Sequence, residues 1–119
     1  MTILESIKEQ LGGYHDDDTT FDKDILALIN SQTAVLVQLG VLDEMTKIDE
    51  STNWSDLIDN ELEASLADTY MYLKVRLLFD TPTSSTMTTE FKEQADEMQW
   101  RLYAIHNKAP ASDEKEDEE

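Results

Sequence analysis

The stretch from Leu62 to Phe79 carries apolar side chains on two opposite sides of a helix, and this pattern constrains the fold more than any other feature of the chain. At about 100° per residue, the apolar positions separate into two stripes. The stripes are Leu62, Leu66, Tyr70, Leu73 and Leu77 on one side, and Met71, Val75 and Leu78 on the other. Because a helix of this kind must pack on both faces, we expect it to lie at the centre of a helical bundle.

The end of this helix is marked by the turn Asp80, Thr81 and Pro82. Proline has no N–H to donate to a helical ladder and disfavours the α conformation in the residue before it. We therefore expect the helix to break by about Asp80. The run Thr83-Ser84-Ser85-Thr86 then offers N-caps for a last helix, and so short a connection predicts that the two helices form an antiparallel hairpin.

Earlier helices are indicated by their caps. Thr2 and Glu5 form a capping box for a short helix that Gly12-Gly13 ends, and Asp22 is a candidate N-cap for a second helix that stops at Gly40. Residues 43–60 are polar apart from Trp54, Leu57 and Ile58, where Thr52 or Asn53 is placed to cap a single turn. No run alternates with period two for long enough to predict a strand.

The chain is therefore expected to be all-α, a small bundle of four to five helices that ends in an antiparallel helical hairpin. Its 119 residues are enough for one domain. We assign residues 1–109 to the helical domain and expect residues 110–119, which include the acidic run Asp113–Glu119, to be a disordered acidic tail.

The segment from Ile25 to Leu42 has no charged residue and is therefore a candidate for a membrane-spanning helix. Five polar residues interrupt it and no basic cluster flanks it, which argues against a membrane span. Because the rest of the chain is so acidic, we expect this uncharged helix to be covered by protein on more than one side.

The net charge of −18 comes from 27 acidic and nine basic residues. Binding to nucleic acid through phosphate neutralisation is therefore disfavoured, as is binding to an anionic membrane. The absence of cysteine excludes disulfides, thiolate metal sites and cysteine nucleophiles. We find no signal peptide pattern at the N-terminus.

Catalytic chemistry is not indicated. His15 falls in a loop and His106 near a helix end, and neither pairs with a nucleophile in any known motif. The acidic loop that begins at Asp16 has Ala27 at the twelfth position, where a calcium-binding EF-hand needs Glu, and the segment from Asp43 has Trp54 there. We predict no enzyme activity and no catalytic, cofactor or metal site.

Two aromatic residues are unusual in the last helix. The expected core stripe is Met87, Phe91, Ala95, Met98, Leu102 and Ile105. Trp100 and Tyr103 lie about 180° and 120° from Phe91, and burying one such ring stabilises by up to about 5 kcal/mol. Either the first helix or the 43–60 segment folds over them, or they contact another subunit or partner.

Two cations, Lys74 and Arg76, lie between the two apolar stripes of the central helix. In the simpler alternative, Lys74 extends its ammonium group to the surface and Arg76 pairs with a carboxylate of its own chain. In the other, the bidentate guanidinium of Arg76 bridges to a carboxylate of a neighbouring subunit.

The stretch Tyr70–Ser85, YMYLKVRLLFDTPTSS, resembles the hallmark segment of the head–tail connector (head-completion adaptor) proteins of long-tailed phages. Members more often carry Pro than Thr at position 81. Further similar segments occur in the order of the family, so the resemblance extends over most of residues 1–107. They are Phe21–Ile25, Ile29–Ser31, Gln38–Val41, Trp54–Ile58 and, after the hallmark, Met98–Leu102. The acidic tail is not part of the pattern.

The resemblance implies a structural protein of the virion neck that is assembled in the host cytoplasm and has no catalytic site. It implies a homo-oligomeric ring, usually of twelve subunits, between the portal protein and a stopper or tail-completion protein, through which DNA passes without specific binding. Trp100, Tyr103 and Arg76 then become candidates for a subunit or portal contact. Acidic residues lining such a channel would repel phosphate and let DNA slide.

The same charge permits another hypothesis, an acidic DNA mimic whose carboxylates imitate phosphates and block a host DNA-binding enzyme. A third alternative is a small helical assembly factor that is absent from the finished particle.

Overall fold

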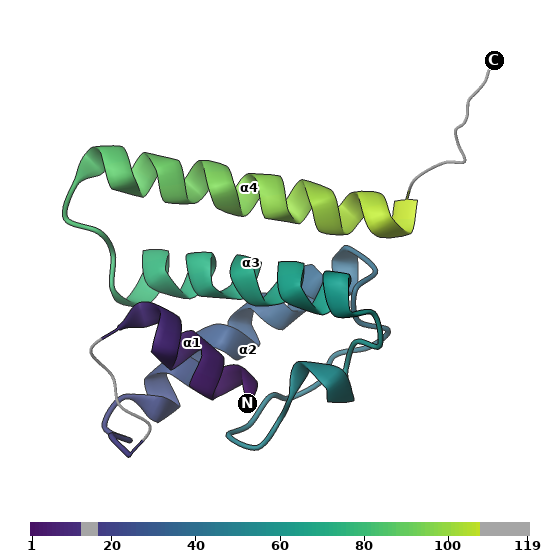
Figure 1. Cartoon of the computed structure of the whole chain (residues 1–119), viewed down its shortest axis with the longest axis horizontal. Helices are drawn as coiled ribbons and strands as arrows, with labels where there is room; N and C mark the ends of the chain where they lie inside the picture. The colour runs from purple at the N-terminus through teal and green to yellow at the C-terminus, as the bar shows by residue number, and fades with distance from the viewer. Residues whose placement is uncertain (13–16, 108–119) are drawn as a thin grey trace.

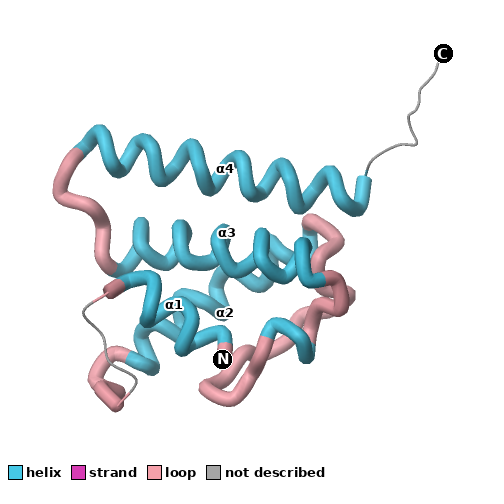
Figure 2. The backbone as a smooth tube through the Cα atoms, viewed as in Figure 1, coloured by secondary structure: helices cyan, strands magenta, loops and turns pink. Residues whose placement is uncertain are grey.

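A computed structural model describes residues 1–12 and 17–107, and this part of the chain contains helices and no strand (Figures 1 and 2). The helices are α1 (Ile3–Leu11), α2 (Asp22–Gln38), the short 3₁₀ helix η1 (Trp54–Asp56), α3 (Glu61–Phe79) and α4 (Ser85–Asn107). This confirms the prediction of a small all-α bundle. The tail assigned to residues 110–119 and the loop residues His15 and Asp16 lie outside the described residues.

Helix α1 begins and ends as its sequence predicts. The Thr2 hydroxyl accepts a hydrogen bond from the Glu5 N–H at 3.1 Å, and the Glu5 carboxylate accepts one from the Thr2 N–H at 2.8 Å. Gly12 follows the helix with φ +74°, a conformation that side chains disfavour. Between these caps, Ile3 and Ile7 are fully buried and anchor α1 in the core.

Helix α2 differs from the prediction at its first residue. Asp22 is not an N-cap, because it is already helical and Phe21 occupies the cap position without a side-chain hydrogen bond. The Asp22 carboxylate instead lies 2.9 Å from the ammonium group of Lys8, whose side chain is almost fully buried. At the other end, Gly40 has φ +84° and ends the helix as expected.

The uncharged helix is fully buried along one side and partly covered beside it. Its buried residues recur at helical spacing: Ile25, Ile29, Thr33 and Leu36. Asn30 extends the cover, because its side chain pairs with both the N–H and the carbonyl of Ile48, at 2.8 and 2.9 Å, and holds that loop against α2. On the outer side Ala27, Ser31 and Ala34 are exposed, so the expected cover on more sides is incomplete within the described residues.

Helix α3 is the centre of the bundle, and its packing on both faces is confirmed. Helix α4 lies along one side of α3, whereas α1 and α2 lie on the other (Figure 1). Tyr70, Met71 and Val75 are buried in the middle of the helix. The two stripes were predicted too long, because Leu62 is 66% exposed and Leu78 is 55% exposed near the ends of α3.

Helix α4 packs chiefly on α3 and runs in the opposite direction (Figure 1). Of the predicted core stripe, only Ala95 and Leu102 are buried, and Met87 is 44% exposed. The stripe is narrower than predicted because, among residues 1–12 and 17–107, α4 has a neighbour on one side only. Most of its surface is therefore available to groups outside the described fold.

Candidate interaction surface on α3 and α4

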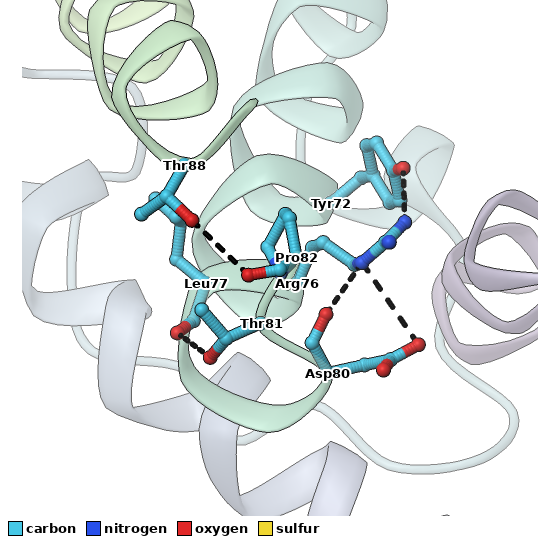
Figure 3. Close-up of polar contacts among 7 residues, drawn as sticks. All are labelled: Tyr72, Arg76, Leu77, Asp80, Thr81, Pro82 and Thr88. Atoms are coloured by element: carbon cyan, nitrogen blue, oxygen red, sulfur yellow. Dashed lines mark hydrogen bonds and ion pairs between the residues drawn. The ribbon is translucent and has the colours of Figure 1, made fainter. Parts of the chain in front are cut away.

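The turn between α3 and α4 is fixed by side chains from both helices (Figure 3). Helix α3 ends at Phe79, and Asp80 takes the cap position with a non-helical backbone. The Thr81 hydroxyl donates to the Leu77 carbonyl at 2.7 Å, and the Thr88 hydroxyl donates to the Pro82 carbonyl at 3.2 Å. These bonds join the turn to the last turn of α3 and to the first turn of α4.

Arg76 is engaged within its own chain (Figure 3). Its Nε donates to the Asp80 carbonyl at 2.5 Å and lies 3.9 Å from the Asp80 carboxylate, and its Nη1 donates to the Tyr72 hydroxyl at 3.4 Å. The guanidinium carbon also lies 5.5 Å from the centre of the Phe91 ring, a cation–π contact with α4. Arg76 thus neutralises the C-terminal end of α3 and joins it to α4, while 22% of its side chain stays exposed.

Trp100 and Tyr103 form an exposed aromatic pair on α4. Their rings stack with centroids 5.9 Å apart and planes 27° apart, and the residues are 62% and 44% exposed. The alternative in which α1 or the 43–60 segment covers them is wrong, because those segments pack on the other side of α3 (Figure 2). Two large rings therefore remain in contact with water on a chain that buries its other tryptophan more deeply.

A groove runs along α4 beside this pair. One hollow, of about 340 Å³, is lined by Leu39, Gln99, Trp100 and Tyr103 together with Asp96. A second, of about 430 Å³, has walls from α3 and α4 and is lined by Lys74, Leu77, Leu78, Thr81, Thr88, Lys92, Ala95 and Asp96. Asp96 borders both hollows, so they adjoin along one face of α4, and we refer to the two together as the α4 groove, with lysines at one end and aromatic rings at the other.

The C-terminal end of α4 is fixed near this groove. The imidazole Nε2 of His106 contacts the buried carboxylate of Glu63 at the start of α3. The Cβ of His106 also lies so close to Gly40 that a Cβ built at Gly40 would be 3.2 Å away. The aromatic pair is therefore carried on a helix that is held at both ends.

Asp96 also affects a buried group. Tyr70 on α3 is 1% exposed, and its hydroxyl donates to the Gln32 side chain on α2 at 3.5 Å. Burial raises the pKa of the Tyr70 phenol, and the negative charge of Asp96 raises it further. The Tyr70 phenol is therefore neutral at physiological pH.

Two features are absent from the described residues, a metal-binding cluster and a membrane-spanning helix. Residues 1–12 and 17–107 contain no group of three His, Asp or Glu side chains that could hold a metal ion. Within the same ranges, none of the helices is long and apolar enough to cross a membrane.

The comparison with protein families decides the identity of the chain. A family model described as phage connector protein matches residues 3–109. The chain belongs to the phage connector family. This confirms the resemblance to head–tail connectors and identifies the protein as a structural component of the phage neck. Searches of curated proteins and of solved structures each return no match.

The match covers every described helix of the connector and stops before the acidic run Asp113–Glu119. The groove, the aromatic pair and the α3–α4 turn all lie inside it. The acidic run lies outside the matched residues.

Proposed function

We infer that this connector forms a ring adaptor between the portal and the stopper or tail-completion protein in the virion neck. The ring, of twelve copies, extends the DNA channel and helps to complete the head after packaging. Its role is structural, without catalysis or a cofactor, and its assembly takes place in the host cytoplasm. The observation that carries the proposal is the exposed Trp100–Tyr103 pair on a connector-family fold.

The aromatic pair is the proposed contact with the portal or with the next subunit. Interfaces are anchored by aromatic residues that become buried at their centre, and the stacked pair offers two such rings side by side. The exposed part of Arg76 is proposed to contribute at the edge of the same interface. Its contacts to Asp80 and Tyr72 are within its own chain, so an interfacial carboxylate would add to them.

The charge of the connector supports a role as a DNA conduit. A net charge of −18 repels phosphate, so DNA would pass through a ring of such subunits without binding. Exposed carboxylates on α4 include Glu90, Glu93 and Glu97. Charge alone does not separate this function from DNA mimicry, but the family match favours the adaptor.

The test is assembly on the cognate portal ring, followed by sedimentation and electron microscopy. Wild-type chain is expected to sediment with the portal as a coaxial ring, and the double variant Trp100→Ala/Tyr103→Ala is expected to stay free while keeping its helical circular dichroism. Met45→Ala is the matched control, because Met45 is also 62% exposed but lies away from α4. Equal binding by the double variant would show that the aromatic pair is not the contact.

The DNA-mimic alternative predicts a different partner. A mimic would bind a basic nucleic-acid-binding enzyme of the host tightly, and the binding would weaken steeply with salt. Capture of such an enzyme by the immobilised chain, with no binding to portal, would replace the adaptor proposal.

A further inference from the structure

The groove along α4 has two chemically different ends, and its charge is unusual for this protein. Lys74 and Lys92 line one end and Trp100 and Tyr103 line the other, with Asp96 between them. Within residues 1–12 and 17–107, neither lysine ammonium lies within 4.0 Å of a carboxylate. Two cations thus face a groove on a chain whose net charge is −18.

The sequence that follows α4 has a matching order. After Asn107 come Lys108, then Ala109-Pro110-Ala111, then Ser112, then the acidic run Asp113–Glu119. After Lys108, small apolar residues come first and carboxylates last. In the groove, the aromatic rings lie nearest the C-terminal end of α4 and the lysines lie farthest from it. If residues 108–119 turn back along α4, their apolar residues therefore meet the rings and their carboxylates meet the lysines.

The distances agree as well. At about 1.5 Å per helical residue, Tyr103 and Trp100 lie about 6 and 10 Å back from Asn107, Asp96 about 16 Å and Lys92 about 22 Å. At up to about 3.3 Å per extended residue, Pro110 reaches about 10 Å, Ser112 about 16 Å and Glu114 about 23 Å. These reaches are upper limits, so Pro110 can come as far as the aromatic pair, and residues of the acidic run from Glu114 onward can come as far as the lysines.

From this match we propose that residues 108–119 of the same chain dock into the α4 groove, with Pro110 against Trp100 and Tyr103 and the acidic run Asp113–Glu119 at Lys92 and Lys74. Proline packs well on aromatic faces and has little conformational freedom to lose. Carboxylates beside the two lysines gain attraction at short range, which salt screens. A second lysine pair, Lys23 and Lys47, lines a groove on α2, but Asp49 and Glu50 line it too.

Docking would give the acidic tail a regulatory role. This consequence rests on the proposed function, because the tail would cover the aromatic pair that the portal or the next subunit is proposed to bind. The free connector would then be shielded from premature association, and a partner would have to displace the tail. Removing residues 110–119 is expected to speed assembly on the portal.

The docking itself is tested on the free full-length chain, so its outcome does not depend on whether the connector forms a ring. The chain has no cysteine, so Glu116→Cys gives one site for a nitroxide spin label. Amide signals of residues 88–103 are expected to lose intensity in the labelled ¹⁵N chain. The loss should disappear at about 1 M salt, where the screening length is about 3 Å.

Two variants and one mixture make the test specific. The double reversal Lys74→Glu/Lys92→Glu is expected to abolish the intensity loss, whereas Lys23→Glu/Lys47→Glu, which changes the net charge equally, should preserve it. A mixture of spin-labelled unenriched chain with unlabelled ¹⁵N chain should show no loss. Loss in that mixture would mean that the tail docks on another copy, and either that result or an absence of loss at residues 88–103 in the labelled chain would overturn the proposal.

Discussion

Asp68 on α3 is predicted to be the most important single carboxylate for the stability of this connector. Its Oδ2 accepts hydrogen bonds from the Ser6 hydroxyl and the Gln10 amide, each at 2.8 Å, and its Oδ1 accepts one from the Trp54 indole N–H at 2.7 Å. Ser6 and Gln10 belong to α1 and Trp54 begins η1. One side chain therefore attaches both elements to α3.

The magnitude follows from the environment of each bond. A hydrogen bond to a charged group contributes about 1.5–3 kcal/mol. The Gln10 bond is exposed and competes with water, whereas the Ser6 and Trp54 bonds are partly buried. Counting the two partly buried bonds at the low end of that range, Asp68→Ala is expected to lower the free energy of unfolding by about 3 kcal/mol.

The assay is urea denaturation followed by circular dichroism, with two comparisons. Asp59→Ala removes the same charge from an exposed position and is expected to change the unfolding free energy by less than about 0.5 kcal/mol. Asp68→Asn keeps one acceptor oxygen but replaces the other with an amide group that cannot accept a hydrogen bond. Its loss of unfolding free energy should therefore fall between those of Asp68→Ala and Asp59→Ala. An Asp68→Ala loss no larger than that of Asp59→Ala would refute the reasoning.

Three further predictions concern α1, α2 and their caps. Lys8→Met should lower the free energy of unfolding by about 3 kcal/mol in the same assay, because it leaves the partly buried Asp22 carboxylate without its cation. An unchanged urea midpoint would contradict this. Gly40→Ala should lower the free energy of unfolding by about 1–2 kcal/mol, since φ is +84° and His106 is close. A variant more stable than wild type would show that alanine is accepted at this position without strain. Hydrogen bonds from Thr2 hold the pKa of Glu5 below its usual 4.5, so Glu5 stabilises the fold above that pH and the contribution is lost as pH falls through the lowered pKa. The stability difference between wild type and Glu5→Gln should therefore be present at pH 7 and vanish in acid, and a difference that persisted at low pH would rule this out.

Local signals in the sequence predicted the helices well because their causes are local. The capping box at Thr2, the positive φ at Gly40 and the break at Pro82 each depend on a few neighbouring residues. The two apolar stripes likewise predicted the central place of α3. The stripes could not show where neighbouring helices stop, and this is why Leu62 and Leu78 are exposed.

The sequence did not predict the long-range contacts. Nothing in the sequence near Asp68 indicates that it accepts bonds from Ser6 and Trp54, and nothing near Glu63 predicts its contact with His106. Lys8 is different, because it shares a helical face with Leu4 and Leu11 and this spacing was a signal of burial. Whether Trp100 was covered depended on which side of α3 the other helices occupy, and a helical wheel of α4 alone cannot decide that.

The most direct test of the account is a cryo-electron microscopy map of the assembled phage neck with this chain traced in it. The account predicts a ring of this connector coaxial with the channel, adjoining the portal, with Trp100 and Tyr103 covered by the portal or by the next subunit. A neck that lacks the chain, or a ring in which both aromatic residues face solvent, would contradict the central claim.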